Sequence, residues 1–352
     1  MQKLKGVYNK IGFPRLIIAL FLLILLVSSK VLGLSQANIW NSILVRFGMN
    51  SILVLAMVPG IRAGIGVNFN LTLGVVFGLL GALLSIEFGF TGGMGFLMAL
   101  VIAIPMATVA GILYGLMLNR VKGQEMTVGN YIGLSIVSFM CIIWLLLPFT
   151  NLSLTWPMGK GLRTTVSMEN SFGHFLNNLW AFPKGTGVFD TASKFSFPTG
   201  MILFFVLIAG LLWIFNRSKT GNAMAVSGAN ESFAISNGLN VNRYRVLGTT
   251  ISTVLGAIGI VVYAQAFGFL QLYRAPLYMA LPAAASILIG GATLKEAKII
   301  HVIIGTFLFQ SLLVVALPVI NIISDGQMAE IIRIIISNGI ILYALTRGGE
   351  EE

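Results

Sequence analysis

Long apolar runs separated by short polar segments dominate the pattern of this chain. The runs recur along nearly its whole length at about 20 residues each, the length that an α-helix needs to cross a bilayer. They predict an all-α integral membrane protein with about ten transmembrane helices, which forms a single permease-like domain over residues 1–352. The predicted helices cover residues 14–34, 39–59, 71–87, 95–118, 128–148, 199–215, 247–267, 278–289, 299–320 and 328–345.

Two stretches interrupt this pattern and predict broken or re-entrant segments. Residues 60–70 read GIRAGIGVNFN, and residues 268–291 contain several glycines and prolines. Non-helical backbone at membrane depth is tolerated only where it is buried in protein or lines a cavity. Discontinuous helices of this kind often form the substrate site of a transporter. If residues 268–291 only re-enter the membrane, the chain has eight or nine crossings.

Glycines also recur four residues apart within the predicted helices. Gly74 and Gly78 form one such pair, and Gly111 and Gly115 form another. Small residues at this spacing let two membrane helices approach closely. We therefore predict that both pairs are packing surfaces between helices.

The charge distribution predicts the orientation of the chain. Only 9% of its residues are charged, and the net charge is +11. Most Lys and Arg lie between apolar runs, which is typical of topology determinants and lipid contacts and disfavours a nucleic-acid partner. The rule that cytoplasmic loops are positive predicts cytoplasmic termini, including the tail 346–352. It also predicts an extracytoplasmic loop over 150–198 and a cytoplasmic loop over 217–245.

The sequence contains no catalytic or metal-binding constellation. It has one cysteine, Cys141, and two histidines far apart, His174 and His301. No segment has the spacing of a phosphate-binding P-loop. We therefore expect no catalytic residue, no metal and no cofactor. The acidic residues fall in loops or at helix ends, which argues against proton coupling, because that coupling usually needs a buried acid or base.

Four amides flank the two predicted breaks and are candidate contacts for a transported solute. They are Asn68, Asn70, Gln265 and Gln271. Amides offer paired donors and acceptors to a neutral, hydroxyl-rich molecule. The alternative is that they make hydrogen bonds between helices.

A polar stretch over residues 220–241 predicts a short helix at the cytoplasmic surface. Asn230 is a good N-cap, and Glu231 suits the positive end of the helix dipole. Phe233 and Ala234 contribute to an apolar face, and Gly238 fits the left-handed position that follows a helix. Such a helix could dock on a soluble partner. The alternative is a connecting loop with one helical turn.

The same stretch resembles the cytoplasmic segment of bacterial ABC-importer permeases of the ribose, nucleoside and branched-chain amino acid type. The matching residues are Gly228, Asn230, Ala234, Gly238 and Val241. A second match lies at Ile289–Thr293 and Gly305–Thr306. The chain departs from simple-sugar members over residues 63–71, where it lacks their acidic residue, and at 295–297, where Lys, Glu and Ala replace glycines. These departures leave the solute class open.

The resemblance implies a permease subunit in the bacterial inner membrane, with ATP hydrolysed by a separate subunit. Two permease subunits, alike or different, would form the pathway for a small polar solute, with a simple sugar or nucleoside as the leading candidate. An extracytoplasmic solute-binding protein would deliver that solute. The residues implied in coupling to the ATPase are Gly228, Asn230, Glu231, Phe233, Ala234 and Gly238. The alternatives are an ion-coupled secondary transporter of a small polar solute and a membrane scaffold or channel.

Overall fold

The structure, a computed structural model, describes residues 13–68, 71–156, 161–180, 196–323, 331–332, 334–335 and 338–342. Helices make up most of the described chain, and two short strands lie among them. In chain order the elements are α2 (Phe13–Val31), α3 (Gln36–Leu55), α4 (Met57–Arg62), α5 (Leu71–Glu87), α6 (Gly92–Leu118), α7 (Glu125–Leu146), β1 (Thr165–Ser167), α8 (Phe175–Asn178), α9 (Thr199–Arg217), α10 (Lys219–Ala229), α11 (Glu231–Ser236), α12 (Val241–Phe267), β2 (Phe269–Gln271), α13 (Arg274–Tyr278), α14 (Ala280–Ile289) and α15 (Ile299–Ile323).

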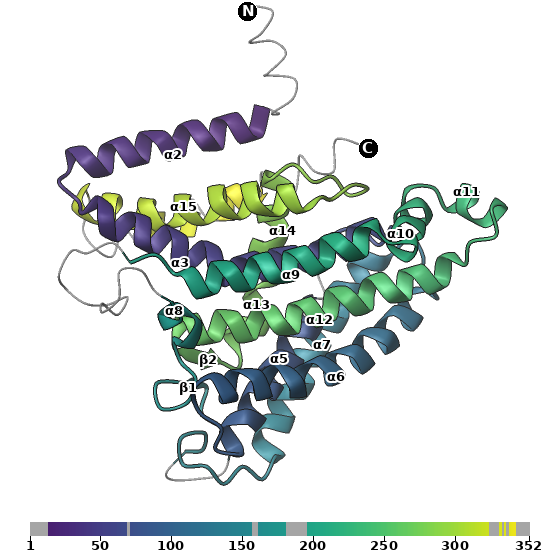
Figure 1. The fold of residues 1–352 in the computed structure, drawn as a ribbon, viewed down its shortest axis with the longest axis horizontal. Coiled ribbons are helices and arrows are strands. Elements are labelled where there is room, and N and C mark those ends of the chain that lie inside the picture. Colours follow the sequence, from purple (N-terminus) through teal and green to yellow (C-terminus); the bar gives the residue numbers. More distant parts are fainter. Residues whose placement is uncertain are drawn as a thin grey trace, which may run out of the picture.

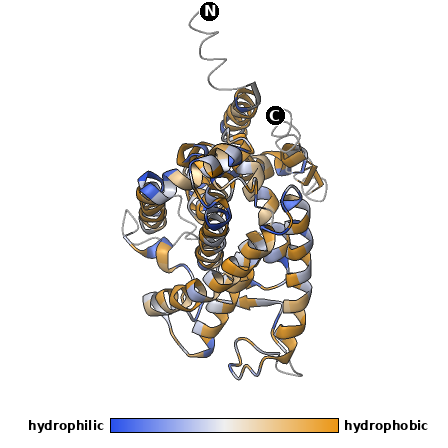
Figure 2. Ribbon diagram, turned by 90° about the vertical axis from the view of Figure 1, so that its right-hand side faces the viewer, coloured by the Kyte–Doolittle hydropathy of each residue, from blue (hydrophilic) through white to orange (hydrophobic). Residues whose placement is uncertain are grey.

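The long helices run in roughly one direction, which gives the molecule two ends. Figure 1 shows α10 and α11 at one end and β1, β2 and α8 at the other. We call the first the inner end, because the charge distribution predicts that it faces the cytoplasm, and the second the outer end. Hydrophobic residues colour most of the ribbon when it is viewed along the bundle, as expected for helices surrounded by lipid (Figure 2).

Helix α12 is the centre of the bundle and packs against α3, α4, α5 and α6. A Cβ at Gly74 or Gly78 of α5 would run into α12. The same is true of Gly111 and Gly115 of α6, where a Cβ would run into residues 246–253 of α12. The absence of side chains at these positions brings the backbones together. The predicted packing role of both glycine pairs is therefore confirmed.

Six segments of the described chain are long and apolar enough to cross a membrane. They are Gln36–Arg62, Gly92–Leu118, Glu125–Leu146, Thr199–Arg217, Val241–Phe267 and Ile299–Ile322. Leu71–Glu87 and Arg274–Ile289 are shorter apolar helices. A multi-pass helical membrane protein is confirmed, whereas ten crossings stay a prediction. Half of the predicted helix 328–345 falls outside the described residues, and Asn70 and the tail 346–352 lie outside them entirely.

Both predicted breaks are present in the described chain. The first follows α4, where Gly64 and Gly66 have φ angles of 74° and 80° and interrupt the helix before α5. The second consists of β2, α13 and α14 in succession, and the predicted helix 278–289 corresponds mainly to α14.

The described chain is mostly helical, as predicted, and two local features add detail to the predictions of an all-α fold and of a loop over 217–245 that carries a short helix. Strand β1 pairs antiparallel with β2, with Val166 opposite Leu270. Strands of three residues are too short to show a periodic pattern, and this pairing joins distant parts of the chain. The segment 217–245 is also mostly helical: Ser218 caps α10 by accepting a hydrogen bond from the Gly221 N–H at 3.1 Å, and α12 already begins at Val241.

Candidate functional site

Helix α11 has the caps that the sequence predicts. The Asn230 side chain accepts a hydrogen bond from the Phe233 N–H at 2.9 Å. At the other end Gly238 has a φ of 74°, which glycine adopts without steric strain. Its N–H donates to the Ile235 carbonyl at 2.9 Å, and the next N–H donates to the Ala234 carbonyl at 3.0 Å. These bonds form a Schellman motif that ends the helix.

The same helix presents an apolar surface beyond the inner end of the bundle. Ala234 is fully buried, whereas Phe233 and Ile235 are 56% and 59% exposed. The Glu231 carboxylate pairs with the Lys122 ammonium in the turn between α6 and α7. The ion pair joins α11 to the bundle and leaves its apolar side chains accessible to a partner.

Helix α10 joins this surface to the first break through a close backbone contact. An ideal Cβ built at Gly64 would lie 2.8 Å from the Gly228 Cα, and one built at Gly228 would lie 2.6 Å from the Gly64 nitrogen. Both distances are well below the roughly 3.5–4.0 Å of a comfortable carbon contact. The end of α10 and the segment after α4 therefore cross backbone against backbone.

The first break also contacts α7, through Gly66. An ideal Cβ at Gly66 would lie 2.6 Å from the Met126 Cε, so the end of this methionine occupies the space beside the glycine. Met126 in turn lines a pocket. A continuous series of contacts thus runs from α11 through α10 and the first break to a pocket wall.

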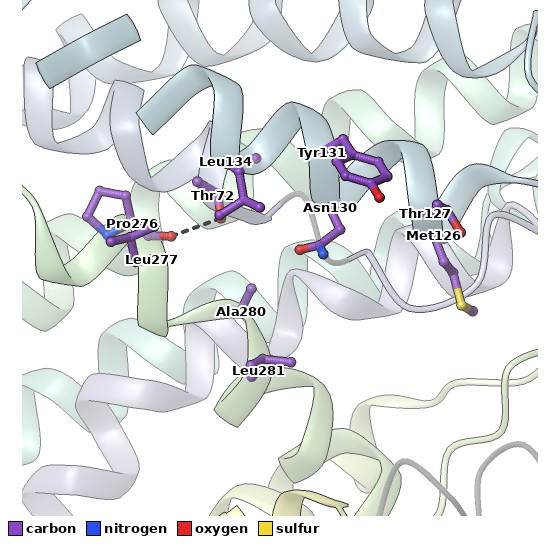
Figure 3. A pocket seen from close by; sticks show the side chains of 11 residues that line it. Thr72, Met126, Thr127, Asn130, Tyr131, Leu134, Pro276, Leu277, Ala280 and Leu281 are labelled. Carbon is purple, nitrogen blue, oxygen red and sulfur yellow. Dashed lines mark hydrogen bonds between the residues drawn. The ribbon is translucent and has the colours of Figure 1, made fainter. Parts of the chain in front are cut away.

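The pocket has a volume of about 450 Å³ and lies between α7, the beginning of α5 and the second break (Figure 3). Its polar side chains come from α5 and α7, and its apolar ones mainly from α7, α13 and α14. The lining residues are Thr72, Met126, Thr127, Asn130, Tyr131, Gly133, Leu134, Pro276, Leu277, Ala280 and Leu281. None of them carries a charge. The pocket can therefore offer hydroxyl and amide groups, but no ionic partner, to a molecule within it.

Two polar side chains, Thr72 and Asn130, shape this pocket. The Thr72 hydroxyl donates to the Pro276 carbonyl at 2.9 Å and joins the beginning of α5 to α13. The Asn130 amide points from α7 toward the space beside Ala280 (Figure 3). Asn130 and Tyr131 are exposed, with 67% of Tyr131 accessible. The pocket is therefore open along α7.

The four amides chosen from the sequence lie outside this pocket lining or outside the described residues. Asn68 is 2% exposed, and its amide donates to the Ser252 hydroxyl at 2.8 Å, which donates onward to the Ala56 carbonyl at 2.7 Å. These bonds hold the first break against α12. Asn70 is not described. Sequence analysis missed Thr127 and did not single out Asn130, although residues three apart share one face of a helix.

Gln265 and Gln271 lie at the outer end. Gln265 is fully buried; its side-chain oxygen accepts from the Leu176 N–H at 3.1 Å, and its amide donates to Asn177 at 3.4 Å. These bonds attach α8 to α12. Gln271 is half-buried in β2 opposite Thr165. The described contacts of Asn68 and Gln265 are hydrogen bonds between segments of the chain, the alternative that the sequence left open.

A buried ion pair at the inner end was not anticipated from the sequence. Arg245 is only 5% exposed, and its guanidinium donates to the Glu125 carboxylate at 2.5 Å and to the Asn119 side chain at 3.2 Å. A charge so deeply buried requires such partners. The pair joins the beginning of α12 to the first residue of α7, next to Met126. The part of α7 that borders the pocket is thus attached to the bundle at its inner end.

Comparison with known proteins gives two matches. The family described as "Branched-chain amino acid transport system / permease component" matches residues 39–345. The chain is also similar to the "Autoinducer 2 import system permease protein LsrC" of Enterobacter sp. (strain 638). The two are 23% identical over 289 residues, which are 82% of this chain and 74% of the relative. No solved structure matches.

Proposed function

Because the chain belongs to the family of branched-chain amino acid transport system permease components and is a multi-pass permease subunit of an ABC importer in the bacterial inner membrane, we propose a role for each part of its site. The pocket beside α7 is part of the solute pathway. The α10–α11 segment is the element that a cytoplasmic ATPase subunit engages. The solute arrives from an extracytoplasmic binding protein.

The assignment of the pocket rests on the segments that meet there. The second break borders it, the first break lies against Met126 in its wall, and irregular backbone in a membrane protein survives where it lines a cavity or is buried in protein. The pocket is open along α7, so a second permease subunit, identical or related, would close it. This arrangement gives a pathway between two subunits, with each contributing one wall.

The chemistry of the lining favours a small, neutral and hydroxyl-rich solute. Thr127 and Asn130 supply hydroxyl and amide groups, and no charged side chain belongs to the described lining. A zwitterionic amino acid needs partners for its carboxylate and ammonium groups, whereas a sugar needs paired donors and acceptors. A simple sugar therefore fits best, and a nucleoside is the second choice. The similarity to an autoinducer 2 permease supports a solute other than an amino acid.

One observation carries the coupling role. Gly228 of α10 touches Gly64 of the first break, and Gly66 of the same break touches Met126 in the pocket wall. Packed backbone transmits displacement because interiors are dense and resist compression. A push on α11 by an ATPase would therefore reach the inner end of the pocket through contacts already in place. The exposed Phe233 and Ile235 are the proposed docking side chains.

The test is reconstitution of the full chain with its ATPase and binding protein in liposomes. We expect ATP-dependent uptake and solute-stimulated ATP hydrolysis, and a loss of both in a variant with Phe233→Ser and Ile235→Ser. Ser236→Ala changes the same exposed helix without removing apolar surface and serves as the control. Uptake that persists without the ATPase and follows a sodium or proton gradient would instead establish an ion-coupled transporter.

A further inference from the structure

A second hollow lies between α2 and α15. These two helices are in contact and lie side by side (Figure 1). The groove has a volume of about 720 Å³. It is lined by Arg15, Leu16, Ala19, Ile303, Ile304, Phe307 and Leu308. Arg15 is the single polar residue in this set, and it stands near the inner ends of both helices. The groove is therefore apolar along its length and cationic at one end.

The Arg15 guanidinium is held in place by shape rather than by an acceptor. It lies directly against Gly291, whose φ is 95°, and occupies the space that a Cβ there would fill. Among the described residues, no oxygen accepts a hydrogen bond from it and no carboxylate pairs with it. A guanidinium has five N–H donors, and a half-buried one gains strongly from an anion. The side chain is thus positioned for an acceptor that another molecule supplies.

Further cationic groups lie around the neighbouring His301 and Glu296. Arg15 and Lys298 are both close enough to His301 to act on its imidazole electrostatically. The Nε of Arg62 is buried without a hydrogen-bond partner in the described chain. Lys295 is exposed nearby in sequence. Repulsion among so many cations favours binding of an anion between them.

The acidic group in this cluster is already engaged. The Glu296 carboxylate pairs with the Lys298 ammonium at 2.7 Å, and this hydrogen bond holds the pKa of Glu296 below its usual value. Both partners are more than half exposed, so the pair contributes little energy. Glu296 therefore leaves Arg15 and Arg62 without a hydrogen-bonding carboxylate in the described chain.

We propose that the α2–α15 groove binds an anionic phospholipid of the inner leaflet. The phosphate lies against Arg15, with Lys298 and His301 beside it, and an acyl chain follows Leu16, Ala19 and Phe307 toward the middle of the membrane. A single molecule then satisfies both the cationic end and the apolar length of the groove. The cytoplasmic leaflet supplies such lipids at the predicted depth of Arg15. Inorganic phosphate would satisfy only the cationic end.

The experiment is native mass spectrometry of the full detergent-purified chain titrated with phosphatidylglycerol or phosphatidylcholine. We expect retained phosphatidylglycerol adducts in the wild type and at least five-fold fewer in Arg15→Gln. Arg274→Gln removes an exposed cation at the outer end and should leave the adducts unchanged. Ala19→Trp fills the groove without changing charge and should also reduce them.

Several results would overturn the proposal. These are equal retention in Arg15→Gln and the wild type, equal loss in Arg274→Gln, or no preference for phosphatidylglycerol over phosphatidylcholine. Inorganic phosphate at millimolar concentration should not displace the lipid; displacement would mean that the site recognises phosphate alone. A thermal melt of each variant in the same detergent identifies any that fail to fold. Only folded variants enter the comparison, and Ala19→Trp and Arg15→Gln test the two ends of the site separately.

Discussion

Gly228 and Gly64 touch backbone to backbone, so the end of α10 and the segment after α4 cross with no side chain between them. This contact is one physical connection between the exposed α11 and the pocket beside α7, besides the Glu231–Lys122 ion pair. A crossing without side chains has no rotamer to absorb a displacement. Movement of one segment is therefore passed to the other.

The first prediction concerns this crossing. Gly228→Ala places a methyl group against the backbone of residues 62–64, and overpacking of this kind costs about 1–3 kcal/mol. We expect ATP-dependent uptake to fall at least ten-fold while the ATPase still co-purifies with the chain. Gly210→Ala in α9 is the matched control, because nothing lies within 4 Å of its added methyl. Wild-type uptake by Gly228→Ala would rule out transmission through this contact.

The second prediction concerns the cap of α11. Asn230→Ala removes the acceptor for the Phe233 N–H and should destabilise this short helix by about 1 kcal/mol. Because α11 lies outside the bundle, the melting temperature of the whole chain should hardly change. Solute-stimulated ATP hydrolysis should decrease several-fold. Ser232→Ala, an exposed change in the same helix, should retain it, and equal behaviour of the two variants would argue against a role for the cap.

The third prediction separates two asparagines. Asn130→Leu removes an amide from the pocket and should raise the KM for uptake about ten-fold without lowering the melting temperature. Asn68→Leu removes the buried bond to Ser252 and should lower the melting temperature instead. Uptake kinetics and thermal melts of both variants decide the matter. An unchanged KM in Asn130→Leu would assign Asn130 to packing.

The fourth prediction concerns Gln265. Replacing it by leucine leaves the buried Leu176 N–H without its acceptor, at a cost of about 1–3 kcal/mol. We expect a lower melting temperature and faster proteolysis of the outer segment near α8. Gln124→Leu, a change at an exposed position before α7, is the control. Equal melting temperatures of the two variants would show that the hydrogen bond from Leu176 to Gln265 does not contribute to the stability of the chain.

The fifth prediction is a pH dependence at the outer end. Burial lowers the pKa of His174, and the nearby Glu169 opposes this effect only in part. The folded chain therefore favours the neutral His174 imidazole. The stability that the buried neutral side chain contributes is fully present above about pH 6.5, the pKa of an unfolded histidine. That stability is lost as the pH falls toward the lower pKa of the folded chain.

His174→Asn should reduce this dependence, because asparagine does not titrate. Asparagine also tolerates the positive φ of 56° at this position, so the variant adds little backbone strain. Thermal melts of both proteins from pH 8 to pH 5 measure the effect. If the melting temperatures of the wild type and the variant change with pH in the same way across this range, the predicted role of His174 is wrong.

The sequence predicts the helices well because each is a long apolar run, and it predicts α11 because Asn230 and Gly238 are strong local signals. It misses β1 and β2, whose pairing is a contact between distant segments. It also misses the pocket: Asn130 and Pro276 become neighbours of one cavity only when α7 packs beside α13. The sequence predicts Asn68 as a solute contact because the residue lies in a break. A break can also be held in place by hydrogen bonds, however, and Asn68 makes such a bond to Ser252.

The central place of α12 has a consequence for biogenesis. Ribosomes release the chain in order, so α3, α5 and α6 enter the membrane before α12 exists. Roughly 120 residues separate the end of α6 from the beginning of α12, which corresponds to on the order of 10 seconds of synthesis. During that interval the glycine seams of α5 and α6 face lipid or another insertion factor. Nascent chains truncated before α12 should therefore be better substrates of membrane proteases than the full chain.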